Sequence, residues 1–197
     1  MNHFFSLLIT VCLSTSSLVA QDFGKDISTA KTAYTAGKLE ESHFALLQAL
    51  QEIDIRIGQE VLKLLPQLLD TMKVNPKDDQ VTGNMGFVGT TIRRTYGKAP
   101  GGELTIIGNS PFISSLNALL NAPLVGGLMN DANHKIVRIQ GYKGRMEKST
   151  EENGENYSLE IPLNNSLITL KAYHSSESLF LKLAETIPFQ QIARLIQ

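Results

Sequence analysis

The spacing of apolar residues along this 197-residue chain changes near residue 73, and this change limits what the chain can fold into. Between Phe44 and Leu65, apolar residues recur at steps of three and four, the period of a helix with one buried face. Beyond residue 84, short runs rich in β-favouring residues alternate with turns that contain glycine, proline or asparagine. A helical first part followed by adjacent strands predicts an α+β fold.

The first part, residues 21–72, is predicted to form a helical hairpin. Gly37 interrupts the apolar pattern of the first helix, and glycine tolerates the positive φ that ends a helix. The pattern resumes at Leu39 and continues to Pro66, with a further apolar turn that ends at Met72. Two helices joined by a tight turn form an αα-hairpin.

Residues 33–42 contain an aromatic residue, a glycine and a small residue in that order, namely Tyr34, Gly37 and Ser42, and Ala49 lies further along the chain. With this spacing, residues 24–65 resemble one tetratricopeptide repeat. No second copy follows, whereas stacked repeats need about three units for stability. We therefore expect a lone hairpin packed on the rest of the protein. The resemblance implies a groove for a peptide, and ordinary helix packing is the alternative.

Charged residues, asparagine and proline cluster in residues 73–83, which are predicted to be a linker or an exposed loop before a sheet domain at 84–197. This domain is predicted to hold an antiparallel sheet of about five strands in ββα-βββα order, backed by helices. One sheet face would take the helices, and the other would face solvent or a partner. The expected strands are 86–96, 103–108, 135–147, 156–162 and 166–173, and the expected helices are 111–121 and 176–186.

The strand-rich residues 86–110 and the terminal residues 184–195 resemble an uncharacterised class of exported α+β proteins. This resemblance implies no activity. The helix-backed antiparallel sheets of exported lipid-carrier proteins are similar in gross architecture, which is an analogy of fold alone.

The first 20 residues are predicted to be a signal peptide. The apolar run from Phe4 to Leu13 is shorter than the roughly 20 residues that span a bilayer, but it fits the core of a signal peptide. Cleavage near Ala20 would release the mature chain into the periplasm or outside the cell. A lipid anchor at Cys12 and a buried N-terminal helix are the alternatives. We expect no transmembrane span in the rest of the chain.

Catalytic motifs are not found in the sequence. Cys12 is the single cysteine, so cleavage at Ala20 would leave no disulfide and no thiolate nucleophile. His43, His134 and His174 lie far apart and lack the spacing of a metal site. Neither a GxSxG motif nor a GxxxxGK loop is present. We expect no catalysis and no cofactor, and a net charge of −1 argues against a nucleic-acid ligand.

Two groups of residues are candidates for a ligand or partner surface. Arg93, Lys143 and Arg145 fall on expected strands in a locally basic stretch and could form an anion-binding sheet face. The alternative is a solvated face balanced by neighbouring acids. The second group lies in an apolar segment that could line a ligand mouth or tuck onto the core. It comprises Phe112, Leu124, Leu128 and Met129.

These features predict an exported, non-catalytic protein of the cell envelope that binds another macromolecule through the hairpin or the open sheet face. The repeat-like hairpin and the lack of catalytic spacing motivate this hypothesis. The alternative is a carrier of an apolar or anionic lipid-like ligand, suggested by the apolar segment 112–129 beside a basic sheet. An enzyme whose site is assembled from scattered residues is a third hypothesis.

Overall fold

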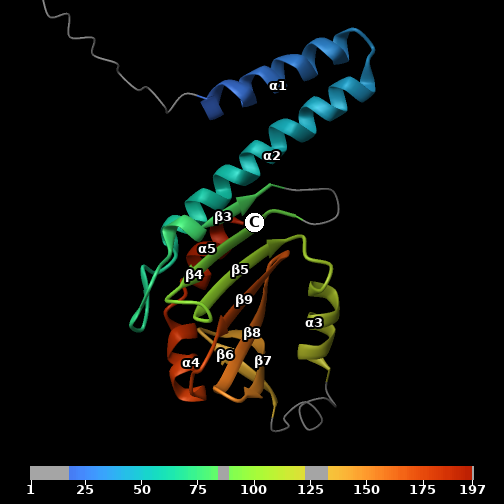
Figure 1. Cartoon of the computed structure of the whole chain (residues 1–197). Helices are drawn as coiled ribbons and strands as arrows, with labels where there is room; N and C mark the ends of the chain where they lie inside the picture. The colour runs from blue at the N-terminus through green and yellow to red at the C-terminus, as the bar shows by residue number, and fades with distance from the viewer. Residues whose placement is uncertain (1–17, 84–88, 123–132, 197) are drawn as a thin grey trace, which may run out of the picture. The chain divides into compact units, whose positions relative to one another are not determined.

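A computed structural model of the chain describes residues 18–83, 89–122 and 133–196 (Figure 1). Residues 1–17, which hold most of the expected signal peptide, lie outside this range. The chain divides into two compact units, of which the first ends at Glu52 and the second begins at Ile53. This boundary falls inside a helix that spans residues 39–64.

The first unit contains helix α1 (Leu18–Thr35) and the first half of helix α2 (Leu39–Leu64). Gly37 lies between the two helices at a φ of 73°, in the left-handed region that glycine favours. The helices contact each other through small side chains, and Ser42 Oγ donates a 2.9 Å hydrogen bond to the carbonyl oxygen of Ala30. The alanines buried along this contact are Ala30, Ala33, Ala45 and Ala49.

The segment after α2 differs from the expectation of a helical turn that reaches Met72. α2 ends at Leu64, before Pro66, which has no N–H to donate to a continuing helix. The chain then forms two short paired strands, β1 (Leu68–Leu69) and β2 (Met72–Lys73). A 3₁₀ turn, η1 (Pro76–Asp78), follows.

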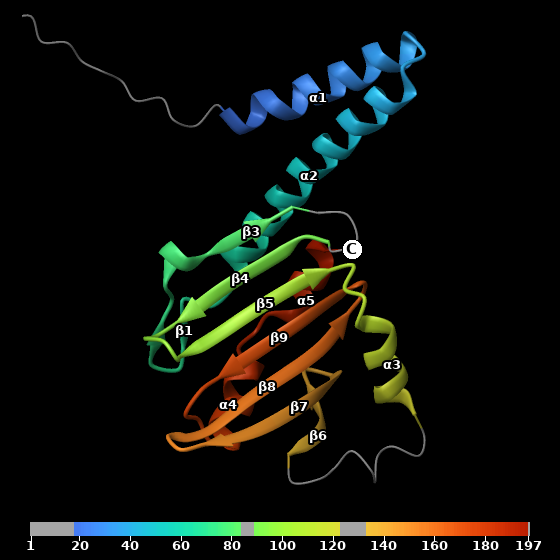
Figure 2. The ribbon, with the colours of Figure 1, turned by 45° about the vertical axis from the view of Figure 1, so that its right-hand side comes forward.

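The second unit is built around a seven-stranded sheet in the order β3-β4-β5-β9-β8-β7-β6, in which every neighbouring pair is antiparallel (Figure 2). The two sheet edges are therefore formed by β3 and β6. The strands are β3 (Gln80–Thr82), β4 (Thr91–Tyr96), β5 (Gly102–Gly108), β6 (His134–Ile139), β7 (Tyr142–Glu151), β8 (Gly154–Leu163) and β9 (Ser166–Ala172).

The α+β class is confirmed, but the sheet is larger than predicted. The single strand expected at 135–147 is two strands, β6 and β7, because Gln140 and Gly141 reverse the chain at φ values of 49° and 87°. Positive φ at both central residues is typical of a two-residue hairpin turn. β3 lies within residues 73–83, where the sequence indicated a linker or loop, and it pairs with β4.

Helix α3 (Ile113–Asn121) follows β5, so three strands of the main sheet precede it and four follow it. The predicted ββα-βββα order is therefore wrong in its strand count. The sequence indicates a helix start at residue 111. The helix begins later, and Ser110 Oγ accepts a 3.4 Å hydrogen bond from the Phe112 N–H ahead of the first turn.

One face of the sheet is buried beneath α4 (Glu177–Glu185), α5 (Phe189–Leu195) and the second half of α2. Figure 2 shows α4 and α5 behind the strands. The helix expected at 176–186 is thus confirmed as α4, and Ser176 Oγ caps it by accepting a hydrogen bond from the Leu179 N–H. The largest side chains of this core include Tyr96, Leu104, Ile106, Leu159, Ile161, Ile168, Leu170, Phe180 and Phe189, each under 2% exposed.

The opposite face, called the open face here, carries mainly polar side chains because successive residues of a strand point to alternate sides. On β4, Arg93 and Thr95 lie on this face and remain partly exposed, whereas Ile92 and Tyr96 are buried on the other face. α3 packs on part of the open face through Leu116, Leu120 and Leu167.

Candidate functional site

A groove opens where the β4–β5 turn meets residues 74–78. Its volume is about 720 Å³, within the range of about 300–1,000 Å³ that is typical of ligand pockets. Arg93 and Thr95 of β4 and Glu103 of β5 line it from the sheet, and residues 99–102 line it from the turn. All of these residues belong to the second unit.

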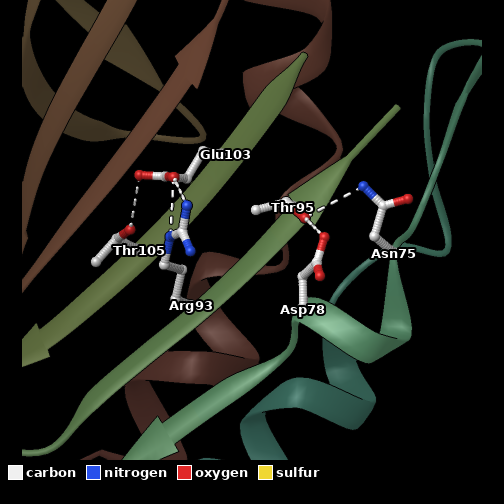
Figure 3. Close-up of polar contacts among 6 residues, drawn as sticks. All are labelled: Asn75, Asp78, Arg93, Thr95, Glu103 and Thr105. Carbon is white, nitrogen blue, oxygen red and sulfur yellow. Dashed lines mark hydrogen bonds and ion pairs between the residues drawn. The ribbon is translucent and has the colours of Figure 1, made fainter. Parts of the chain in front are cut away.

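Arg93 and Glu103 form an ion pair across the groove side of the sheet (Figure 3). Arg93 Nε and Nη2 donate to the same Glu103 oxygen, Oε2, at 2.9 Å and 2.6 Å. Thr105 Oγ1 donates to the other oxygen at 3.4 Å. β4 and β5 place Arg93 opposite Thr105, so the pair is diagonal and the register alone brings the two charges together.

Residues 74–78 form the other wall of the groove, and a series of hydrogen bonds connects this wall to β4 (Figure 3). Asn75 Nδ2 donates to Thr95 Oγ1 at 3.2 Å and to the carbonyl oxygen of Gly97 at 2.8 Å. Thr95 Oγ1 in turn donates to Asp78 Oδ2 at 3.2 Å. The Asn75 N–H also donates to the Thr95 carbonyl, at 2.9 Å. These contacts fix the side chains of the wall before any ligand is present.

Apolar and charged groups at the rim complete the groove. Tyr173 lines it, and the Tyr173 N–H donates to the Gly101 carbonyl oxygen at 3.1 Å. A side chain at Gly101 would overlap the carbonyl oxygen of Tyr96, so the turn requires glycine there. Lys77 is exposed and forms none of the ion pairs found among the described residues.

Tyr173 also lines a second hollow, of about 260 Å³. Lys171 of β9, Ser158 of β8 and Glu147 of β7 line this hollow. The strand registers pair Glu103 with Lys171, Lys171 with Ser158, and Ser158 with Glu147. One row of polar side chains therefore crosses the open face from the groove to the second hollow.

A buried ion pair supports the sheet behind the groove. Arg94 donates to both oxygens of Asp79, at 2.9 Å and 2.6 Å, and to the carbonyl oxygen of Leu65 at 3.2 Å. The hydrogen bonds to Asp79 raise the pKa of Arg94, and burial offsets only part of this effect. Burial raises the pKa of the neighbouring Tyr96 phenol to about 12. The Tyr96 hydroxyl donates to the Pro66 carbonyl at 3.0 Å.

The three cations expected on the sheet do not converge on one site. Arg93 is on β4, whereas Lys143 and Arg145 are on β7, beyond β5, β9 and β8 in the sheet. Lys143 Nζ donates to the carbonyl oxygen of Leu120 at 3.2 Å. Arg145 lies 3.2 Å from an oxygen of Glu147 and 3.7 Å from one of Glu160.

The apolar candidates give less information. Phe112 is 66% exposed at the start of α3, and Leu124, Leu128 and Met129 lie outside the described residues. Within the described ranges, no three His, Cys, Asp or Glu side chains gather in a way that could hold a metal ion. None of the described helices is both long enough and apolar enough to cross a membrane.

No protein-family model, curated protein or solved structure matches the chain at a significant level.

Sequence reasoning singled out Arg93 but missed the other polar residues of the groove. The charge- and turn-rich run 75–79 supplies Asn75 and Asp78, and it was interpreted only as loop. The role of Glu103 as the partner of Arg93 depends on the register between two strands, which the sequence does not signal. The signal for Asn75 was present, because asparagine before proline often ties a turn to neighbouring backbone.

Proposed function

We propose that the protein is an exported, non-catalytic binding module of the cell envelope, and that the groove holds a segment of a partner protein. The groove of about 720 Å³, with polar side chains held in place by their own hydrogen bonds, carries this proposal. A preorganised site loses less conformational entropy when a ligand binds, so more of the contact energy appears as affinity.

The chemistry of the lining favours a protein ligand. Tyr173 offers an aromatic surface of the kind enriched at protein interfaces. Lys77 and Asp78 at the rim present both signs of charge, which suits a segment that itself carries both signs.

The arrangement of charges favours binding over catalysis. Acid–base catalysis needs a group whose pKa is tuned to transfer a proton. In the groove, Glu103 is held by Arg93 and Thr105, and Asp78 accepts a hydrogen bond from Thr95. These contacts keep the carboxylates in place as acceptors and suit a recognition surface.

Export rests on the leader pattern of residues 1–20 and is tested by the N-terminus of the mature protein. We expect Gln21 as the first residue when the protein is recovered from its native envelope fraction. Replacing Ala20 with arginine should block cleavage and leave the precursor. A mature N-terminus at a lipid-modified Cys12 would replace free export with an anchor.

The alternative of a lipid carrier has less support. Between the sheet and the helices, Phe180, Leu183 and Phe189 are buried and fill the space where an apolar ligand would lie. A cavity of about 120 Å³ beside Asp54 is small and is lined by polar and apolar side chains alike. Native mass spectrometry of freshly purified protein tests this alternative, which predicts a co-purified lipid.

The groove is tested by site-specific photo-crosslinking in intact cells. A photoreactive residue in place of Tyr173 should capture a discrete partner, and the same residue in place of Lys182 on α4 is the matched control. Lys77→Glu should lower the yield at the Tyr173 position about tenfold if the ligand contacts this charge. Equal capture from both positions, or capture that is unaffected by Lys77→Glu, would contradict a binding role for the groove.

A further inference from the structure

In the first unit, small residues are buried in the contact between α1 and α2, whereas large apolar residues are exposed to solvent. Ala30, Ala33, Ala45 and Ala49 are at most 4% exposed, and Ser42 bonds to Ala30 across the contact. Small side chains let two helices approach closely. The larger apolar side chains of both helices are therefore not used to hold the unit together.

Six large apolar side chains form what we call the hairpin apolar face. At 3.6 residues per turn, Phe23, Ile27 and Tyr34 follow one stripe along α1. Leu39, Leu46 and Leu50 follow one stripe along α2. For an observer who looks down each helix from its N-terminus, the stripe lies clockwise of the side that contacts the other helix. Because α2 runs back along α1, both stripes fall on the same side of the unit.

These side chains are open to solvent in a single copy. The exposed fractions are 38% for Phe23, 41% for Ile27, 68% for Tyr34, 64% for Leu39, 45% for Leu46 and 56% for Leu50. At roughly 100 Å² for each such side chain, the face amounts to about 600 Å². Apolar patches on soluble monomers reach about 300–600 Å², so this face is at the upper limit.

Charges along the border of the face match a second copy of the same face. Lys31 lies on the outer border of the α1 stripe, and Glu40 lies on the outer border of the α2 stripe. Both are exposed, and neither takes part in the ion pairs found among the described residues, whereas Lys38 pairs with Glu41 at 3.1 Å. Lys31 and Glu40 both sit near the turn at Gly37, at the same end of the unit.

We propose that two copies of this chain associate through the hairpin apolar face into an antiparallel four-helix arrangement. A twofold axis parallel to the helices places α1 of one copy against α2 of its partner, with both turns at the same end. Lys31 of each copy then meets Glu40 of the other. Two copies bury about 1,200 Å², the lower end of specific interfaces. An unrelated partner helix would have no reason to repeat this pairing of opposite charges.

Sedimentation equilibrium of the full chain at about 1–100 µM tests the proposal. The wild type should be a dimer. Leu46→Asp with Leu50→Asp should be monomeric, with unchanged circular dichroism. Phe44, which is 61% exposed but lies off this face, supplies the matched control: Phe44→Ser should remain a dimer. A monomeric wild type, or equal dissociation by both changes, would overturn the proposal.

Charge exchange identifies the occupant as a second copy. Lys31→Glu and Glu40→Lys should each raise the dimer dissociation constant about tenfold, because each leaves two like-charge contacts across the axis. The double variant Lys31→Glu with Glu40→Lys restores opposite charges and should dimerise as the wild type does. Failure of this rescue, while the single changes weaken the dimer, would contradict the proposed axis. Loss of the dimer leaves the groove proposal unaffected, since the groove is tested by crosslinking at Tyr173.

Discussion

Replacing Asp79 with alanine should be among the most destabilising single changes in the sheet. Asp79 is the counter-charge of Arg94, whose side chain is 6% exposed and whose guanidinium donates to both Asp79 oxygens. The change leaves a buried cation that keeps its hydrogen bond to the Leu65 carbonyl but loses its counter-charge. Removing one partner of a buried pair costs about 3–5 kcal/mol of unfolding free energy. Arg94 cannot escape the penalty by losing its proton near neutral pH.

Urea denaturation measures this cost. With an m value near 2 kcal/mol/M, the expected loss moves the midpoint of unfolding down by roughly 1.5–2.5 M. Total stabilities are about 5–15 kcal/mol, so the variant would retain a folded population only if the wild type is well above the lower limit. Lys135→Ala is the control, because the ion-paired side chains of Lys135 and Glu177 are 43% and 38% exposed and the pair is worth about 1 kcal/mol or less.

The double variant Arg94→Met with Asp79→Leu separates burial of an unpaired charge from loss of packing. With both charges gone, most of the 3–5 kcal/mol should return, because apolar replacements of buried pairs are often neutral or stabilising. The Leu65 carbonyl then loses its donor, which costs about 1–3 kcal/mol. If Asp79→Ala shifts the urea midpoint no more than Lys135→Ala, the argument from buried charge is wrong.

Two further changes test the core. Gly58→Ala on α2 would gain about 1 kcal/mol in helix propensity, but its Cβ would overlap Val81 Cγ1 of β3, so we expect a net loss of about 1–2 kcal/mol that Val81→Ala relieves. The raised pKa of Tyr96, about 12 in the folded state against 10.0, predicts stability that is complete below pH 10 and falls by up to about 3 kcal/mol as pH rises to 12. Tyr96→Phe should flatten that part of the alkaline stability profile, and a profile unchanged by this substitution would contradict the assignment.

Local signals in the sequence predicted the elements whose ends are set locally. Gly37 marked the end of the first helix because its backbone conformation, at a φ of 73°, is one that glycine adopts without strain. α4 was placed correctly because Ser176 caps it and its apolar residues repeat at helical spacing. Neither feature depends on distant parts of the chain.

The sheet was underestimated because two of its features depend on contacts or on unusual turn residues. In the sequence, β6 and β7 look like one strand. The turn between them depends on a positive φ at Gln140, and glutamine is not a residue that indicates such a turn. β3 contains only Gln80, Val81 and Thr82, and its pairing with β4 makes it a strand. A run this short in a charged segment has no periodicity from which to predict it.

Arg93 and Arg94 lie on opposite faces of the sheet because successive residues of a strand point to alternate sides, but this alternation does not identify their partners. Glu103 and Asp79 reach these arginines only through the registers of β4 with its two neighbours. The basic stretch seen in the sequence is therefore largely neutralised in the fold. An anion-binding role for this face stays a prediction.

The groove and the hairpin apolar face differ in the kind of interaction that they offer, and we expect them to act together. The groove offers fixed hydrogen-bonding groups set among apolar and aromatic side chains, and the fixed polar groups favour specificity. The hairpin apolar face offers area and few fixed polar groups, which suits association of two copies. A dimer carries two grooves, and a partner that presents two matching segments would bind both with an avidity above that of either groove alone. Weak binding at a single groove would then suffice for stable capture of such a partner, and the monomeric Leu46→Asp with Leu50→Asp variant would lose capture of bivalent partners while it keeps the affinity of one groove.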